Sequence, residues 1–189
     1  PSARIDLRTL DGSRDFVVWF GHSSFLLQLS GRRILTDPIF SGCASPVPFT
    51  VRAFAGSDRY SADDMPDLDC LAISHDHWDH LDHETVKALL PRTASVVTTL
   101  GTGSHLRAWG CPEEKLTELD WWESADLGGG FRIHAVPSRH FSGRGFTRNR
   151  SGPDSSTIPR GGASSIPATA ATAPTSAKSA SDSPASGRR

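Results

Sequence analysis

Cysteine is scarce in this chain, with 3 among 189 residues. Cys43, Cys70 and Cys111 form no Cys-x-x-Cys pair, and their number is odd. A sparse and odd set of cysteines argues against a disulfide framework and for a reducing compartment. We therefore expect a cytoplasmic protein.

Long apolar runs and an excess of charge are also missing. No stretch approaches the roughly 20 apolar residues that cross a bilayer, and the N-terminus carries no signal-peptide core. The formal net charge is −1 and the sequence pI is about 6.8, which leaves no broad basic surface for nucleic acid. The composition predicts a soluble protein with no membrane span and no nucleic-acid partner.

The segment from Ser151 to Arg189 lacks the side chains needed for a core. Of its 39 residues, 31 are Ser, Ala, Pro, Gly or Thr, none is aromatic, and the large aliphatic residues are Ile158 and Ile166. Burial of so little apolar surface does not offset the lost chain entropy, so we expect this segment to be disordered. The domains predicted are a globular one over residues 1–150 and a low-complexity tail over residues 151–189.

Residues 1–150 have the hydrophobic pattern of a mixed α/β domain. Apolar alternation and β-branched residues predict strands at residues 16–20, 25–29, 34–36, 69–73, 95–99 and 131–136. Helical spacing predicts helices at residues 83–90 and 104–109. Asp82 is expected to cap the first helix and Pro91 to stop it. Gly42 to Asp67 is expected to form a long loop beside the functional pocket.

A cluster of potential metal ligands follows the apolar segment 69–73. Residues 74–82 are Ser-His-Asp-His-Trp-Asp-His-Leu-Asp, which places 3 histidines and 3 carboxylates within nine residues. Such groups are costly to desolvate together, and a divalent cation is the simplest physical reason to gather them. A polar loop that caps the next helix would explain one His-x-His pair, whereas the full His-x-His-x-Asp-His string favours a metal site. Zinc is the first candidate.

Four segments resemble the metallo-β-lactamase superfamily. Within it, they are similar to the branch of N-acyl-phosphatidylethanolamine phospholipase D-like and ascorbate-phosphate lactonase-like proteins. The segments are residues 19–26 (WFGHSSFL), 34–41 (ILTDPIFS), 74–82 (SHDHWDHLD) and 140–144 (HFSGR), and the similarity covers about residues 15–150. The resemblance implies an αββα sandwich, of which this chain encodes largely the N-terminal half, with a disordered C-terminal tail.

The same resemblance implies which residues hold metal. The first metal of the family corresponds to His75, His77 and His140, and the second to Asp79 and His80. The family also has a bridging aspartate in a Gly-Asp-Ser/Thr-Gly-Tyr segment and a final histidine, and neither follows His140 here. The intact family binds two zinc ions, and we expect at most one to be well ligated in this chain.

A change of reading frame would explain the missing residues. With permissible codons, Ala163 to Ser186 read in another frame can encode Gly-Asp-Ser-Gly-Tyr. We therefore hypothesise a frameshift near Asn149, which makes the chain truncated relative to its family and the tail an out-of-frame translation.

The resemblance implies a zinc-dependent hydrolase of phosphodiester or lactone substrates, with a small-molecule or phospholipid-like substrate. Zinc lowers the pKa of a bound water, and Asp79 is expected to orient the resulting hydroxide as the catalytic residue. The alternative is a non-catalytic fragment or pseudoenzyme that binds at most one zinc, because the bridging aspartate and last histidine are missing.

Three further residues are candidates near the metals. His22 lines the pocket or completes a turn. Asp37 hydrogen-bonds a ligand histidine or caps the turn at Pro38. Arg144 contacts a substrate phosphate or is a solvated surface charge.

Overall fold

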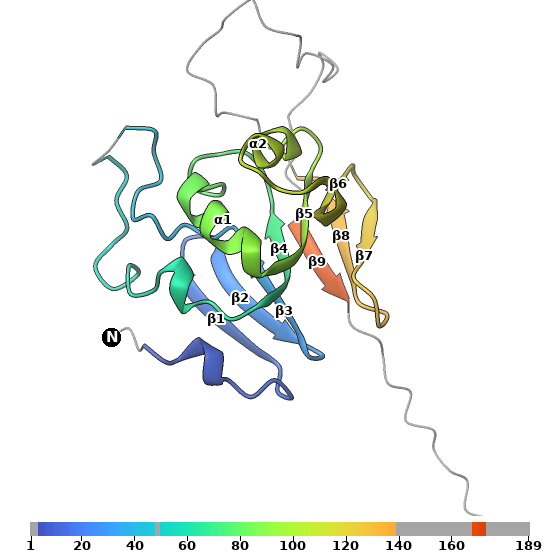
Figure 1. The fold of residues 1–189 in the computed structure, drawn as a ribbon, viewed down its shortest axis with the longest axis horizontal. Helices are drawn as coiled ribbons and strands as arrows, with labels where there is room; N and C mark the ends of the chain where they lie inside the picture. Colours follow the sequence, from blue (N-terminus) through green and yellow to red (C-terminus); the bar gives the residue numbers. More distant parts are fainter. Residues whose placement is uncertain (1–3, 48–49, 139–167, 173–189) are drawn as a thin grey trace, which may run out of the picture.

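A six-stranded sheet is the main element of the computed structural model, which describes residues 4–47, 50–138 and 168–172 (Figure 1). Its strands follow one another in space in sequence order. They are β1 (Phe16–Gly21), β2 (Ser24–Leu29), β3 (Arg32–Thr36), β4 (Leu68–Ile73), β5 (Thr93–Thr99) and β6 (Leu116–Leu119). β1 to β3 pair antiparallel and β3 to β6 pair parallel, so the carboxyl ends of β3 to β6 lie at one edge of the sheet.

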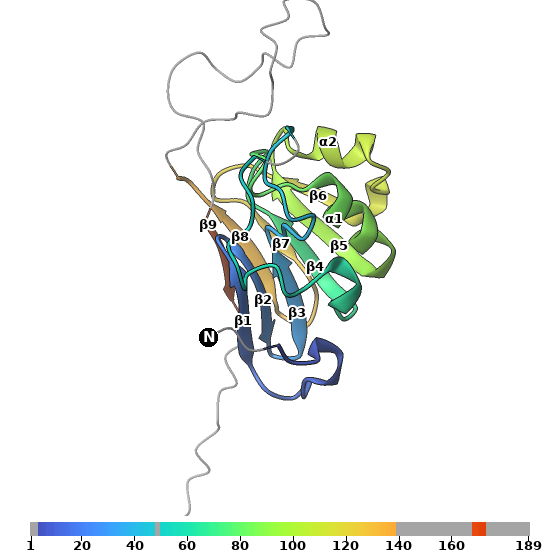
Figure 2. The same cartoon turned by 90° about the vertical axis from the view of Figure 1, so that its left-hand side faces the viewer.

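Two short helices cover one face of this sheet (Figure 2). They are α1 (His83–Leu89), between β4 and β5, and α2 (Gly103–Ala108), between β5 and β6. Alternate side chains of the strands point to this face, so Leu71 and Ile73 of β4 pack with Val86, Leu89 and Leu106 of the helices. The 3₁₀ turns are η1 (Leu7–Thr9), η2 (Ala62–Asp64), η3 (Leu90–Arg92) and η4 (Glu113–Lys115).

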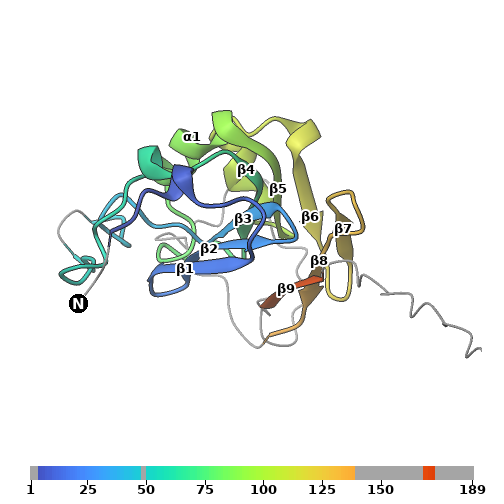
Figure 3. The same cartoon turned by 90° about the horizontal axis from the view of Figure 1, so that it is seen from below.

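A smaller antiparallel sheet packs on the opposite face (Figure 3). Its strands are β7 (Ser124–Asp126), β8 (Arg132–Val136) and β9 (Ala168–Thr172). Phe131 and Ile133 form a second buried core with Cys70, Ala72 and Val97 from the other set of alternating positions. The order of layers is helix, sheet, sheet, which confirms the predicted α/β metallo-β-lactamase type of fold.

The predicted strands and helices are present with ends shifted by one or two residues. β6 and β7 were not predicted. β9 lies inside the stretch that the sequence analysis assigned to the tail, and the rest of residues 151–189 lies outside the described residues. The boundary at residue 150 therefore stays a prediction.

The cap position expected of Asp82 is confirmed, but the capping hydrogen bond of its side chain is not. Asp82 occupies the N-cap position of α1, but its side chain makes no cap hydrogen bond to the helix backbone. Its Oδ2 atom instead accepts hydrogen bonds from the Ser41 N–H at 3.0 Å and from the Thr85 hydroxyl. The carboxylate thus fastens the loop after β3 to the start of α1.

Among the described residues, no helix has both the length and the apolar character needed to span a membrane.

Candidate metal centre

The predicted ligands after β4 and the predicted supporting residue Asp37 after β3 lie at the same carboxyl edge, because β3 and β4 are parallel neighbours. Asp37 directly follows β3, and the segment from Ser74 onward directly follows β4. The Asp37 N–H donates to the Ala72 carbonyl at 3.0 Å, and its φ of 42° lies in the left-handed region, which Asp tolerates better than most residues. The strand pairing therefore brings two segments together that lie 37 residues apart in the sequence.

Asp37 is buried, with 3% of its surface exposed, and both oxygens of its carboxylate have polar partners. Oδ1 accepts a hydrogen bond from the Ser74 N–H at 2.7 Å, and Oδ2 accepts one from the Ser74 hydroxyl at 2.6 Å. Oδ2 also lies 2.8 Å from Nδ1 of His80. A buried carboxylate needs such partners, and this set fixes the orientation of the His80 ring.

Three histidine rings lie against one another, and His80 connects them to this carboxylate. The ring centroids of His75 and His80 are 4.0 Å apart, and those of His75 and His77 are 4.5 Å apart. The Ser74 hydroxyl lies 2.9 Å from Nδ1 of His75. The Nε2 atoms of His75 and His77 are both buried. The loop thus holds its imidazoles in one compact group.

His22 reaches the same group from the turn between β1 and β2. Gly21 and His22 both have positive φ, at 114° and 46°, and the Trp19 indole donates to the His22 carbonyl at 3.0 Å. This turn places Nε2 of His22 3.0 Å from Oδ2 of Asp79. Potential ligand atoms of His22, Asp79 and His80 all lie within 4.8 Å of one another.

The Asp79 carboxyl has a pKa below its usual value. Partial burial acts to raise the pKa, but the charge of His80 and the hydrogen bond from His22 outweigh this effect. Asp79 is therefore ionised at neutral pH.

The donor set suits a transition-metal ion. Imidazole nitrogen and carboxylate oxygen bind zinc at about 2.0 to 2.2 Å, so two ligands of one ion lie roughly 3 to 4 Å apart. Oδ2 of Asp79 lies 3.0 Å from Nε2 of His22 and 3.8 Å from Nε2 of His80, which is this spacing, and the ligand atoms of all three residues lie within 4.8 Å of one another. These residues could hold one metal ion together.

The structure brings most of the candidate residues together. His75, His77, Asp79, His80, Asp37 and His22 lie in one region, whereas His140 and Arg144 lie outside the described residues. The sequence leaves His22 as either pocket lining or a turn residue. The structure has it in the turn between β1 and β2 and beside Asp79, where it is a further potential ligand. Sequence reasoning did not identify Ser74, because one serine beside histidines carries no signature without the pairing of β3 and β4.

Comparison with known proteins gives matches to one family. Residues 32–174 match the family model described as β-lactamase superfamily domain. The chain is 42% identical over 150 residues to an uncharacterized protein of Mycobacterium tuberculosis, covering 79% of this chain and 40% of the relative. It is 34% identical over 145 residues to the N-acyl-phosphatidylethanolamine-hydrolyzing phospholipase D 1 of Caenorhabditis elegans, covering 70% and 39%. The chain spans about 40% of the length of these relatives.

Solved structures show the same fold. A diiron β-hydroxylase from Streptomyces venezuelae superposes with a TM-score of 0.52 at 24% identity, over 67% of this chain and 24% of that chain. An isothiocyanate hydrolase from Delia radicum gut bacteria gives a TM-score of 0.50 at 20% identity, over 64% and 47%.

Proposed function

This chain belongs to the β-lactamase superfamily, whose fold is that of metal-dependent hydrolases, and we propose that it hydrolyses phosphodiester or lactone substrates with zinc as the metal. The C. elegans relative supports a phospholipid-like substrate, because that protein is named for hydrolysis of N-acyl-phosphatidylethanolamine.

One observation carries the proposal. The Asp79 carboxylate lies beside His22 and His80 at the carboxyl edge of the sheet, with their ligand atoms within 4.8 Å of one another. A structural ion pair with Asp79 would need one imidazole, whereas several imidazoles beside a carboxylate are typical of a metal site. We assign His75, His77, Asp79, His80 and His140 as metal ligands, with His22 as an added candidate.

Asp79 and Asp37 would have different roles in the reaction at this site. A bound metal ion would supply a water of lowered pKa and stabilise negative charge that develops on the substrate. The ionised Asp79 would accept a hydrogen bond from the attacking water and hold it in position. The Asp37 carboxylate keeps Nδ1 of His80 engaged at 2.8 Å, so that Nε2 of this ring faces Asp79 at 3.8 Å.

The second candidate is a non-catalytic protein that binds at most one zinc. The sequence favours it at one point, since no Gly-Asp-Ser/Thr-Gly-Tyr segment follows His140. Metal content separates the two proposals.

The test begins with the metal content of the purified chain, measured by inductively coupled plasma mass spectrometry for zinc and iron. The iron measurement matters because one protein of similar fold is a diiron enzyme. Hydrolysis of bis(p-nitrophenyl) phosphate and of a chromogenic lactone is then measured. The catalytic proposal predicts close to two zinc ions per chain, which is more than the single well-ligated ion expected from the sequence alone. It also predicts an activity that Asp79→Asn lowers at least 100-fold.

The matched control is Asp126→Asn, which changes an exposed carboxylate of β7 whose Oδ1 accepts from the Gly128 N–H at 2.8 Å. This variant should keep full activity. One zinc or none, together with no hydrolysis of either substrate, would overturn the catalytic proposal and leave the second candidate.

A further inference from the structure

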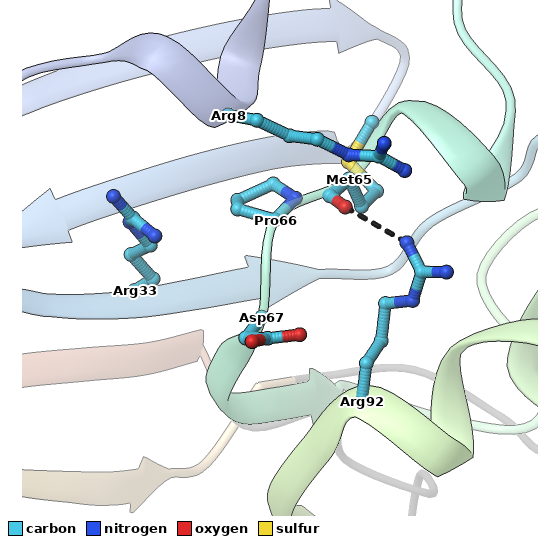
Figure 4. A pocket seen from close by; sticks show the side chains of 6 residues that line it. All are labelled: Arg8, Arg33, Met65, Pro66, Asp67 and Arg92. Carbon is cyan, nitrogen blue, oxygen red and sulfur yellow. Dashed lines mark hydrogen bonds between the residues drawn. The ribbon is translucent and has the colours of Figure 1, made fainter.

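Three arginines line a cavity at the end of the sheet opposite to the metal-ligand cluster. The cavity has a volume of about 410 Å³ and is lined by Arg8, Arg33, Met65, Pro66, Asp67 and Arg92 (Figure 4). It lies at the start of β4, which begins at Leu68, whereas the metal ligands follow the end of that strand. A strand of this length spans roughly 20 Å, so the two sites are separate.

The arginines come from three different elements and meet at one segment. Arg8 belongs to η1, Arg33 to β3 and Arg92 to η3. Figure 4 shows them around the chain from Met65 to Asp67. Residues so distant in sequence are brought to one cavity by the fold itself.

Two of the guanidinium groups are held in place by backbone carbonyls. Arg92 Nη1 donates to the Met65 carbonyl at 3.0 Å, and Arg8 Nη2 donates to the Asp63 carbonyl. Arg33 Nε donates to Oε1 of Gln28 at 3.1 Å. A guanidinium has five N–H donors, so each group keeps donors for a ligand while its position is fixed.

The side chains that line this cavity carry more positive than negative charge. In the part of the chain that the structure describes, no carboxylate forms an ion pair with Arg8, Arg33 or Arg92. The cavity also contains the exposed carboxylate of Asp67. Among the lining side chains, three positive charges against one negative charge leave two. The carboxylates of Asp6 and Asp69 accept hydrogen bonds from the backbone N–H groups of Arg8 and Arg33, which leaves the guanidinium groups themselves without an ion pair among the described residues. A bound anion would relieve the mutual repulsion of the guanidinium groups.

We propose that this cavity binds a small soluble ligand bearing a phosphate group. A phosphate monoester carries a charge between −1.5 and −2 at neutral pH, as the cavity requires, and its oxygens accept the forked donors of arginine. The volume lies within the range of about 300 to 1,000 Å³ that is typical of small-molecule sites. Because the site is remote from the metal ligands, such a ligand would stabilise or regulate the domain and would not be the substrate.

Isothermal titration calorimetry with inorganic phosphate, at constant ionic strength, tests the proposal on the metal-loaded chain. We expect saturable binding that the double variant Arg8→Gln/Arg92→Gln weakens at least tenfold. Arg59→Gln is the matched control, because Arg59 is exposed and does not line the cavity, and it should leave the affinity unchanged. Circular dichroism checks that the variants are folded, and Arg92→Lys, which keeps the charge, should lose less affinity than Arg92→Gln.

Three outcomes would overturn the proposal. The first is an absence of saturable binding. The second is binding that Asp79→Asn abolishes and the double arginine variant retains, since phosphate would then occupy the metal centre. The third is arginine-dependent binding only to phosphatidylcholine vesicles that contain phosphatidic acid, since the phosphate would then belong to a lipid headgroup.

Discussion

At the scale of single residues, Asp37 joins the fold to the candidate metal centre. Its buried carboxylate accepts hydrogen bonds from the N–H and the hydroxyl of Ser74 and contacts the Nδ1 atom of His80. The sequence predicted contact with a ligand histidine as one of two roles for Asp37, the other being to cap the turn at Pro38. It gave no signal for Ser74, whose position depends on the parallel pairing of β3 with β4.

The substitution Asp37→Asn should weaken metal binding. The amide keeps the size of the carboxylate but replaces one acceptor oxygen with an NH2 group. If the NH2 group replaces Oδ2, the His80 N–H loses its acceptor, and if it replaces Oδ1, the Ser74 N–H loses its acceptor. Removal of such a supporting hydrogen bond typically costs about 10- to 100-fold in metal affinity. Competition with a chromophoric chelator measures the change. Asp15→Asn is the control, because Asp15 accepts from the Ser30 N–H at 2.8 Å far from the cluster. An affinity within twofold of the unchanged protein would show that Asp37 does not orient His80.

At the scale of secondary structure, α2 depends on a side chain from the neighbouring strand β6. Glu118 Oε1 accepts hydrogen bonds from the N–H groups of Gly101 and Gly103, at 2.8 and 3.0 Å. Its Oε2 atom accepts from Nη1 of Arg107 at 2.7 Å. One carboxylate thus satisfies backbone donors at the start of the helix and binds a side chain in its last turn.

Gly103→Ala should therefore loosen α2. A Cβ atom at this position would lie 2.4 Å from Cδ of Glu118, so the carboxylate would have to move and release its hydrogen bonds. Their loss should lower the free energy of unfolding by about 1 to 3 kcal/mol. Urea denaturation measures this. In the control Gly12→Ala, the nearest atom to the new Cβ lies 4.0 Å away, so little should change. Equal stabilities of the two variants would contradict the role given to Glu118.

The same scale shows what a sequence can and cannot predict about elements. α1 was predicted because Val86, Leu89 and Leu90 repeat at helical spacing. β6 has 4 residues and β7 has 3, which is too short for alternation to be recognised. Asp82 lies at the predicted N-cap position of α1. Its carboxylate does not cap the helix backbone, because it accepts hydrogen bonds from the Ser41 N–H in the loop after β3 and from the Thr85 hydroxyl.

At the scale of the molecule, two cores lie on opposite faces of one sheet. The second sheet covers β3 to β6, while Val17 and Trp19 of β1 point to the same side and are 63% and 69% exposed. The candidate ligands come from the turn after β1 and the loop after β4, and Asp37 supports them from the end of β3. A metal ion bound there would connect both antiparallel and parallel parts of the sheet.

Removal of metal should lower the stability of the whole domain. An ion present at about 100 times its Kd stabilises a protein by roughly 2.7 kcal/mol. In a domain of this size, that corresponds to a fall in Tm of about 5 to 10 °C on addition of EDTA. Differential scanning calorimetry measures the fall, and Asp79→Asn should show a smaller one. An unchanged Tm after verified loss of metal would mean that the ion does not connect these segments.

The three cysteines of the domain differ in their burial. Burial raises the pKa of Cys70 to about 12 and also raises that of Cys111. Thiol reagents attack the thiolate, so both residues should react slowly at neutral pH. Cys43 is half-buried in the loop between β3 and β4, where its backbone pairs with Arg52. A maleimide fluorophore should therefore label Cys43 selectively, which gives a site-specific optical reporter in this loop with no engineered cysteine.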